Sequence, residues 1–598
     1  MRAIFSSGGR GDPAAAASPV AAALAENSRA FIALAVVSGV INILMLTGSI
    51  FMIQIYDRVL SSRSIPTLAA LSAIAIAAYL FQGSLDAIRN RVLALIGERI
   101  DDTMGPDTYK AVAEMPLRPG KSGQETLQPF RDLEAIRAFV SGPGLVALLD
   151  MPWLPIYLIL CYLFHPLLGY AAFGAAILLF CLAIATELRG RAPMYRALEA
   201  QSQRNLMADN AQRSAEVVRA MGMMPDLAKR WYEAHVRHLT AQRQASYIIG
   251  GLSAIAKMTR MLVQSCMLGL GAYLAIKGEI SAGTIIAASI LSSRALAPVD
   301  HAIGSWKGII AARQGYARLK QIMAARVDTM PHVQLPPPAE SLTVENLFLG
   351  APGMTRPIIR NVSLKLTAGQ ALGIIGASAS GKSTLARALV GIWTPLAGKV
   401  MLDGAAIQQW DPARLGPYVG YLPQDIQLFD GTVAENIARF QTPVNSQAVL
   451  WAARTAGFHE HILALPDGYE TRIGRGGVEL SAGQKQRLGL ARALYGEPFM
   501  VVLDEPNSNL DSEGETALST AIAGVAARKG IVVVVAHRPS AIAAVDLLAV
   551  MHAGEIVAFG PRDEILAKTL QNASDVAKRG AAASDGLRVV TRNTGGQT

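Results

Sequence analysis

The chain has 598 residues and a formal net charge of +10. Apolar residues make up 51% of it and charged residues only 17%, whereas soluble domains average about 25% charged residues. This composition argues against an ordinary soluble enzyme, and also against a disordered chain, which needs low hydrophobicity and high charge. The three cysteines lie in apolar runs without metal-ligand spacing, so they indicate neither a disulfide framework nor a metal site.

Residues 1–28 are rich in Ala, Ser and Gly and lack the apolar core of a signal peptide, which predicts a disordered cytoplasmic segment. Six apolar runs follow, each able to cross a bilayer, because about 20 helical residues span an apolar core of about 30 Å. The runs cover residues 31–53, 66–85, 145–164, 167–184, 247–276 and 282–303. His165 and Pro166 alone separate the third run from the fourth, which predicts a tight extracytoplasmic turn. We therefore expect an all-α, six-span transmembrane domain over residues 29–325.

The basic residues of this half gather in the two long connections, after the second run and after the fourth. Because cytoplasmic loops carry the excess of Lys and Arg, both connections are predicted to be cytoplasmic, and six spans then place both termini there. The connections contain few Pro or Gly and predict helices that continue out of the membrane, for example over 207–221 and 226–244. The net charge thus indicates membrane orientation better than a nucleic-acid partner, the competing explanation.

Five basic or acidic residues fall inside the fifth and sixth runs: Lys257, Arg260, Arg294, Asp300 and His301. Charges within a bilayer are costly and usually face protein or water. Two interpretations stay open. Either these residues line a polar transport pathway, or the helices extend beyond the bilayer and the residues are simply solvated.

The composition changes after about residue 325. A proline-rich stretch, VQLPPPA at 333–339, cannot continue a helix and predicts a linker over residues 326–340. Short apolar strands then alternate with helical patterns, which predicts an α/β domain over residues 341–570. Residues 571–598 are polar and predict a loose tail.

A predicted buried strand over 371–375 runs directly into GASASGKST, which matches the phosphate-loop pattern GxxxxGK[ST]. In such a loop the glycines let the backbone approach phosphate oxygens, and the following helix adds the positive end of its dipole. Lys382 is placed for the β- and γ-phosphates, and Ser383 for Mg²⁺. The predicted nucleotide-binding residues of this loop are Gly376, Ala377, Ser378, Ala379, Ser380, Gly381, Lys382, Ser383 and Thr384.

A second predicted buried strand, over 499–503, ends in Asp504 and Glu505. Asp504 at the strand end can take part in the coordination shell of Mg²⁺. Glu505 can orient or deprotonate an attacking water, as phosphoryl transfer requires. Two acids that serve only solubility would be unusual beside a phosphate loop.

Between these segments lies LSAGQ at 480–484, and here the chain resembles the ABC ATPases, whose signature loop is LSGGQ. Three further family elements occur in the family's order. Gln424 matches the Q-loop, Asp511 the D-loop and His537 the switch histidine. The domain is therefore expected to be a P-loop ABC ATPase.

The resemblance implies ATP and Mg²⁺ as ligands and a homodimer as the working form. Two ATPase domains pair head to tail, and ATP closes the pair because it binds the closed form better than the open one. Hydrolysis reopens the pair, and cytoplasmic helix ends carry the motion to the membrane. The implied catalytic residues are Glu505, His537 and Gln424, and the implied metal ligands are Ser383, Gln424 and Asp504. Contacts with ATP held by the second copy are implied for Ser481, Gly483, Gln484 and Asp511.

Three positions depart from the family pattern. Ala482 replaces the second signature glycine, which is a mild change where the backbone has no positive φ. Arg475 stands where many exporters have an acid that contacts the membrane domain, and no Tyr stands in 347–352, where an aromatic residue usually stacks on adenine. Neither the coupling contact nor the adenine contact is therefore assigned.

Six spans followed by one ATPase domain resemble the exporter half-transporters. Strings in the membrane half narrow the resemblance to type I secretion ATPases of the PrtD kind, which export metalloproteases and related RTX proteins. The strings are DMPW at 150–153, HPLLG at 165–169, SAEVVRAMG at 214–222 and SRALAPVD at 293–300, with DEPNSNLD at 504–511 in the ATPase half. The match covers roughly residues 30–570.

This resemblance implies an unfolded polypeptide substrate with an uncleaved C-terminal signal. The implied partners are a membrane-fusion protein, an outer-membrane tunnel protein and the surrounding membrane lipid, without nucleic acid. The implied location is the bacterial inner membrane, with the ATPase domain in the cytoplasm. A lipid or drug exporter of the same architecture is the alternative. An ATP-gated channel or an importer fits less well, since a gate need not hydrolyse ATP and importers usually separate their membrane and ATPase chains.

Overall fold

The computed structural model describes residues 28–117, 127–324, 334–536 and 539–567. They form two compact units, one within Met1–Pro116 and Lys121–Asp328 and the other mainly from Thr329 onward. The predicted N-terminal segment, apart from Ser28, and the predicted tail over 571–598 lie outside the described residues. His537 and most of the predicted linker lie outside them as well.

The first unit contains the six apolar helical stretches that the sequence predicts. Within the described residues they are Arg29–Ser62, Ile65–Leu117, Pro143–Phe164, Pro166–Arg213, Met224–Ile276 and Ala282–Gly304. The helices of this unit are α3 (Ser28–Leu44), α4 (Thr47–Gln54), η2 (Ile55–Val59), α5 (Leu60–Ser62), α6 (Ile65–Glu114), η3 (Met115–Leu117), α7 (Gln128–Val140), α8 (Pro143–Asp150), η4 (Met151–Trp153), α9 (Leu154–Phe164), α10 (Pro166–Arg213), α11 (Ala215–Ala220), α12 (Met224–Ile276), α13 (Ala282–Gly304) and α14 (Trp306–Ala324). The six-span prediction is confirmed.

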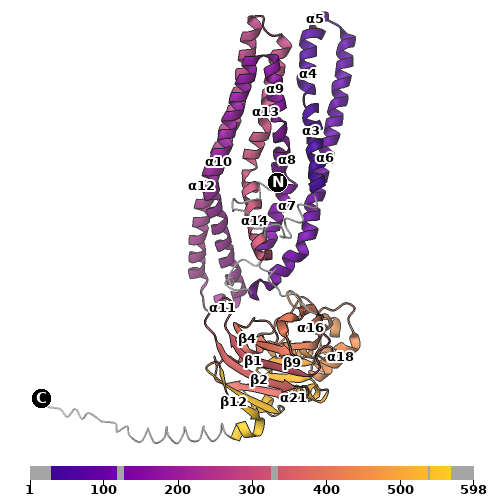
Figure 1. The fold of residues 1–598 in the computed structure, drawn as a ribbon, viewed down its shortest axis with the longest axis vertical. Coiled ribbons are helices and arrows are strands. Elements are labelled where there is room, and N and C mark those ends of the chain that lie inside the picture. Colours follow the sequence, from indigo (N-terminus) through magenta and orange to yellow (C-terminus); the bar gives the residue numbers. More distant parts are fainter. Residues whose placement is uncertain (1–27, 118–126, 325–333, 537–538, 568–598) are drawn as a thin grey trace, which may run out of the picture. The chain divides into compact units, whose positions relative to one another are not determined.

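Three helices are far longer than a membrane crossing requires. α6, α10 and α12 have 50, 48 and 53 residues. At about 1.5 Å per residue each extends over roughly 70 Å or more, against a bilayer core of about 30 Å. Figure 1 shows α10 and α12 side by side along most of their length. The helices therefore continue beyond the apolar runs, as predicted, although the helix expected over 207–221 is interrupted at Ser214, where the backbone leaves the helical conformation.

The expected turn between the third and fourth runs is also present. α9 ends at Phe164 and α10 begins at Pro166, so His165 alone joins them. Proline suits the first helical position because its missing N–H would be unsatisfied there anyway. His165 Nδ1 accepts a hydrogen bond from the Leu167 N–H at 3.2 Å and caps the new helix.

A buried polar cluster ties the first spans together. Arg89 on α6 is 5% exposed, and its Nη1 donates to Asp150 Oδ1 at 3.1 Å while its Nη2 donates to Asp86 Oδ1 at 2.6 Å. Asn42 on α3 donates to the same Asp150 oxygen at 2.9 Å, and the Tyr157 hydroxyl donates to Asn42 Oδ1 at 3.0 Å. Side chains from α3, α6, α8 and α9 thus compensate one another's charges and dipoles away from water.

α13 is the most enclosed of the spans, because 56% of its apolar 18-residue stretch is buried. It carries an ion pair with α12, because Arg260 Nε lies 3.3 Å from Asp300 Oδ2. The other basic residues predicted within the last two spans, Lys257, Arg294 and His301, are exposed.

The second unit is built on a six-stranded sheet in the order β12-β11-β3-β10-β9-β6, in which all neighbours are parallel except β11 and β12. A four-stranded antiparallel sheet, β2-β1-β4-β5, and the β7-β8 pair complete it. The strands are β1 (Ser341–Leu349), β2 (Ile359–Thr367), β3 (Ala371–Gly376), β4 (Ala397–Leu402), β5 (Ala405–Ala406), β6 (Val419–Leu422), β7 (Gly431–Thr432), β8 (Arg472–Ile473), β9 (Met500–Asp504), β10 (Ile531–Val535), β11 (Leu547–His552) and β12 (Glu555–Pro561). The helices are α15 (Lys382–Leu389), α16 (Pro412–Leu415), α17 (Val433–Ile437), α18 (Ser446–Thr455), α19 (His459–Leu463), α20 (Ala482–Leu494), α21 (Ser512–Ala527) and α22 (Pro539–Ile542).

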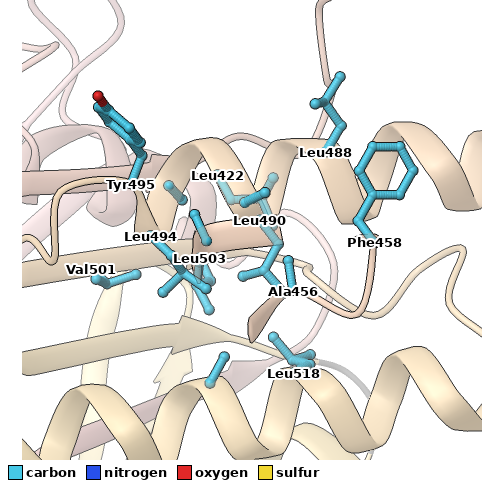
Figure 2. Packing of buried hydrophobic residues seen from close by; sticks show 14 of the residues in the cluster. Leu422, Ala456, Phe458, Leu488, Leu490, Leu494, Tyr495, Val501, Leu503 and Leu518 are labelled. Carbon is cyan, nitrogen blue, oxygen red and sulfur yellow. The ribbon is translucent and has the colours of Figure 1, made fainter. Parts of the chain in front are cut away.

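Apart from Asp504 at the end of β9, the central strands β9 and β10 are apolar, as parallel strands covered on both faces must be. β9 and β10 are buried at every residue. Figure 2 shows Leu490 and Leu494 of α20 packed near Leu503 of β9 and Leu422 of β6. None of these four side chains is more than 2% exposed. This packing fixes α20, whose N-terminus carries the signature sequence, on the sheet that carries the phosphate loop.

Candidate nucleotide-binding site

The predicted site segments meet at one edge of the six-stranded sheet. β3, β10, β9 and β6 are successive parallel neighbours, and Val535 of β10 is level with both Ile374 of β3 and Asp504 of β9. Their carboxyl ends therefore share an edge, where α/β proteins bind ligands. The phosphate loop follows β3, Glu505 follows β9, and Gln424 lies two residues after β6.

The phosphate loop is shaped by its glycines and closed by its lysine. Gly381 has φ of 98°, a left-handed conformation that favours glycine, and it is the N-cap of α15. Lys382 is 5% exposed, and its Nζ donates to the carbonyl oxygens of Gly376 and Ala377, both at 2.9 Å. Burial lowers the pKa of Lys382, while the nearby charges of Glu505 and Asp504 oppose that change. The loop thus surrounds a buried cation, as an anion-binding loop requires.

Ser383 and Asp504 form the pair expected at a metal. The Ser383 hydroxyl donates to Asp504 Oδ1 at 3.0 Å. The second oxygen, Oδ2, is buried and has no hydrogen-bond partner among the described residues. Burial raises the pKa of Asp504, and the Ser383 hydrogen bond partly offsets this rise. A hydroxyl and a carboxylate oxygen are ligands that Mg²⁺ accepts, so the residues present fit this ion.

Glu505 is held in an unusual backbone conformation beside the metal pair. Its φ is 52°, which is costly for a non-glycine residue and characteristic of functional sites. Its backbone N–H donates to the Val535 carbonyl at 3.0 Å, and Gln424 Nε2 donates to Glu505 Oε2 at 3.2 Å. The structure therefore brings together two of the three predicted catalytic residues. The third, His537, lies outside the described residues.

The signature sequence forms the N-terminus of α20. Ser481 and Gln484 make a reciprocal capping box, with Gln484 Oε1 accepting the Ser481 N–H at 2.9 Å and Ser481 Oγ accepting the Gln484 N–H at 3.3 Å. Ala482 is the first helical residue and has no positive φ, so its replacement of glycine is mild, as expected. A Cβ on Gly483 would lie 2.9 Å from the Asn509 carbonyl oxygen, so only glycine fits without rearrangement.

Asp511 is engaged within its own chain. Its Oδ1 accepts the Gly514 N–H at 2.8 Å, which caps α21 and lowers the pKa of Asp511. The same oxygen lies 2.5 Å from Arg487 Nη2 on α20. A contact of Asp511, Ser481, Gly483 or Gln484 with nucleotide stays a prediction.

The remaining loop residues lie around this core. Thr384 and Ser380 are 9% and 4% exposed, and the Ser380 hydroxyl has no hydrogen-bond partner among the described residues. Ala379 has a left-handed φ of 63°. Ser378 is exposed. In the segment that departs from the exporter pattern, the Arg475 backbone N–H donates to Asp430 Oδ1.

Two residues of the site escape sequence reasoning. Gln486 is 1% exposed, and its Nε2 donates to the carbonyl oxygens of Glu505 and Pro506 at 3.3 and 2.9 Å. Arg487 is 3% exposed and donates to the Gly457 carbonyl at 2.5 Å as well as to Asp511. Their signal in the sequence is only that long polar side chains interrupt the apolar face of an amphipathic helix.

Comparison with known proteins decides the family. Residues 359–508 match the ABC transporter family and residues 30–299 match the ABC transporter transmembrane region. The type I secretion system ATP-binding protein PrsD of Rhizobium meliloti (strain 1021) is 50% identical over 551 residues, which cover 92% of this chain and 94% of PrsD. The chain belongs to the type I secretion ABC transporters. This confirms the expected fold class and the expected family.

Other similarities of this type I secretion transporter agree. The leukotoxin translocation ATP-binding protein LktB of Mannheimia glucosida is 28% identical over 90% of this chain and 76% of its own length. A bacterial Atm1-family ABC exporter with ATP bound superimposes with a TM-score of 0.80 at 22% identity, over 93% of this chain and 99% of that one. The transporter is an ATP-binding ATPase and a multi-pass inner-membrane exporter, with its ATPase domain in the cytoplasm.

Proposed function

We propose that this transporter exports unfolded polypeptides that carry a C-terminal secretion signal, such as proteases and RTX-like proteins. The observation that carries the proposal is the 50% identity to PrsD over 92% of this chain, which includes most of the membrane half through which a substrate must pass. LktB is named for leukotoxin translocation, and that function supports a polypeptide substrate. The partners proposed are a periplasmic membrane-fusion protein and an outer-membrane tunnel protein.

The proposed working form is a homodimer with composite ATP sites. Lys382 contacts the β- and γ-phosphates with the rest of the loop, and Ser481, Gly483, Gln484 and Asp511 of the second copy complete the site. One phosphate loop per chain supports this arrangement, since each signature sequence then serves the partner's nucleotide. The proposed domains are a membrane domain over 29–325, a linker over 326–340 and an ATPase domain over 341–570.

Ser383, Asp504 and Gln424 are proposed to hold Mg²⁺, which neutralises phosphate charge when it is bound. Glu505 orients the attacking water and accepts its proton, in a position that Gln424 and Gln486 hold from two sides. His537 contacts the γ-phosphate. Because little covalent chemistry falls to the protein in phosphoryl transfer, such positioning supplies most of the catalysis.

The test uses full-length transporter in lipid nanodiscs. C-terminal fragments of proteins secreted by the same organism are added, with N-terminal fragments of the same proteins as matched controls, and ATPase turnover is measured. We expect at least one C-terminal fragment to bind and change turnover, and the N-terminal fragments to have no effect. A response to lipids or drugs but to none of the fragments would identify the lipid or drug exporter instead.

A further inference from the structure

The last span, α13, leaves one narrow face uncovered. The helix packs against α4, α8, α9, α10 and α12 (Figure 1). Between Ile290 and Gly304, only Arg294, His301 and Gly304 are exposed. Helical residues seven and ten positions apart lie on the same side of a helix. This side, which carries Arg294, His301 and Gly304, is called here the open face of α13.

Arg294 lies deep within the span. At about 1.5 Å per residue, it is about 20 Å along the helix from Ser281 and about 14 Å before Ile303, where the apolar run ends. The extracytoplasmic end of the helix is polar, since the Ser281 hydroxyl donates to Asp57 Oδ2 at 2.5 Å. An extension of the helix beyond the bilayer therefore does not explain Arg294.

Among the residues that the structure describes, Arg294 has no carboxylate partner. Its Nη1 donates to Met45 Sδ at 3.8 Å, and a thioether is a weak acceptor. Charged side chains at membrane depth are costly, and they usually face protein or water and mark transport paths. Because the rest of α13 is enclosed, the open face is where this charge meets water or a partner.

The chain itself supplies no free acid at this depth. The six apolar runs contain only two acids, Asp150 and Asp300. Asp150 accepts a hydrogen bond from Arg89 at 3.1 Å, and Asp300 Oδ2 lies 3.3 Å from Arg260 Nε. A second copy of the chain carries the same two acids in the same pairs, and lipid headgroups lie outside the apolar core. A carboxylate for Arg294 therefore comes from a molecule that enters the span.

We propose that the open face of α13 contacts acidic side chains of the polypeptide in transit, with Arg294 as the main contact; this rests on the proposed export function. A guanidinium can donate two parallel hydrogen bonds to one carboxylate, and such charge-assisted bonds are strong. Gly304 leaves room on the same face, since a Cβ there would meet no atom within 4 Å. An acidic segment that enters from the cytoplasmic end thus reaches Arg294 along an open surface.

The first measurement asks whether water reaches Arg294. Arg294→Cys is made in full-length transporter whose three native cysteines are replaced by alanine, and the protein in nanodiscs is treated with a charged, water-soluble methanethiosulfonate. Leu178→Cys is the control of matched depth, because Leu178 is exposed on α10 and lies about 18 Å from Pro166 at the extracytoplasmic end. A thiol in apolar surroundings stays protonated and inert, so we expect Arg294→Cys to react about tenfold faster or more. Equal or slower reaction would overturn the proposal.

The second measurement asks for the carboxylate. Fluorescein-labelled C-terminal fragments of the secreted proteins are bound to nucleotide-free transporter in nanodiscs, each in its native form and in an amide form with every Asp and Glu changed to Asn and Gln. We expect Arg294→Gln to raise the Kd of the native form about tenfold, the loss of one charged hydrogen-bonded contact, and to leave the Kd of the amide form unchanged. Arg294→Lys, which keeps the charge, and Arg58→Gln, an exposed arginine outside the open face, should bind both forms much as wild type does.

The outcomes separate this inference from the export function. If wild type binds a native fragment and Arg294→Gln binds it equally well, the role of Arg294 is wrong and the export function stands. Equal weakening of the amide form, or equal weakening in Arg58→Gln, also overturns it, because the effect then does not depend on a carboxylate at the open face. If wild type binds no fragment, both fail. Labelling and binding use different variants, so either decides alone should the other variant fail to assemble.

Discussion

At the residue scale, the ATP site concentrates groups that a chain selected only for stability would avoid. Lys382 and Asp504 are charged side chains with 5% and 1% exposure, and Glu505 has a left-handed φ of 52°. Each of these features costs folding free energy unless its surroundings compensate it. Their coincidence at one edge of the sheet indicates that the site is organised for phosphate and metal rather than for the stability of the free chain.

Glu505→Gln is expected to abolish ATP turnover while ATP binding persists. The amide cannot accept the proton of the attacking water, and general-base catalysis is typically worth about 100-fold or more. Turnover by phosphate release and binding by a fluorescent ATP analogue are measured on the same preparation. Glu513→Gln, an exposed acid on α21, serves as control and keeps wild-type turnover. Retained turnover in Glu505→Gln would mean that another group is the base.

Asp504→Asn is expected to raise the melting temperature of the nucleotide-free transporter at neutral pH while abolishing Mg²⁺-dependent hydrolysis. Burial raises the pKa of Asp504 in the folded chain, so the ionised carboxylate costs stability above that pKa. This cost is relieved as pH falls toward the unfolded value, about 4. The advantage of the variant is therefore largest above the folded-state pKa of Asp504, and it shrinks as the pH falls through that pKa toward the unfolded value; melting curves at pH 7.5 and at about pH 4 compare the two conditions. A variant that melts below wild type at both pH values would contradict this account.

At the scale of elements, α20 is the part that joins the separate motifs. Its N-terminus carries the signature sequence, and its apolar face packs on the sheet (Figure 2). Its two buried polar side chains reach the segment after β9 and the start of α21. A shift of α20 must therefore move the surroundings of Glu505 and of Asp511 together.

Arg487→Met tests the link between α20 and Asp511. The substitution removes the charged hydrogen bonds to Asp511 and to the Gly457 carbonyl, so we expect the free energy of unfolding to fall by about 1.5–3 kcal/mol. Turnover per folded molecule falls too, because the signature and D-loop segments lose their link. Arg528→Met is the matched control, since Arg528 also donates to two backbone carbonyls, of Glu497 and Pro498, away from the site. The control should lose stability without losing turnover. Equal turnover in both variants would show that the contact of Arg487 with Asp511 only stabilises the fold.

At the scale of the whole molecule, the sequence predicts what depends on local pattern and misses what depends on tertiary contact. Apolar runs of bilayer length predict six spans. In lipid, the backbone N–H and C=O groups must hydrogen-bond to each other, and only a helix or a closed barrel satisfies them all. The phosphate loop and the acids after β9 are likewise local. The links from Gln486 to Glu505 and from Arg487 to Asp511 join segments that are distant in the chain. Periodicity cannot indicate which buried polar atom will have a partner.

The proposed homodimer predicts how two inactive variants behave when they are mixed. In Lys382→Ala the phosphate loop fails, and in Ser481→Arg the signature sequence fails, so each homodimer has two damaged sites. In a mixed dimer, the intact loop of one chain faces the intact signature of the other, while both defects share the second site. If random assembly makes half of the dimers mixed and sites act independently, co-reconstitution restores about a quarter of wild-type turnover. Glu505→Gln leaves the phosphate loop and the signature sequence intact and gives the comparison. Its defect lies at the phosphate loop of its own chain, so a mixture with Ser481→Arg places both defects in one composite site and recovers turnover. A mixture with Lys382→Ala damages both sites and does not recover. No recovery in the Lys382→Ala and Ser481→Arg mixture, with mixed dimers verified by two affinity tags, would place the complete site within one chain.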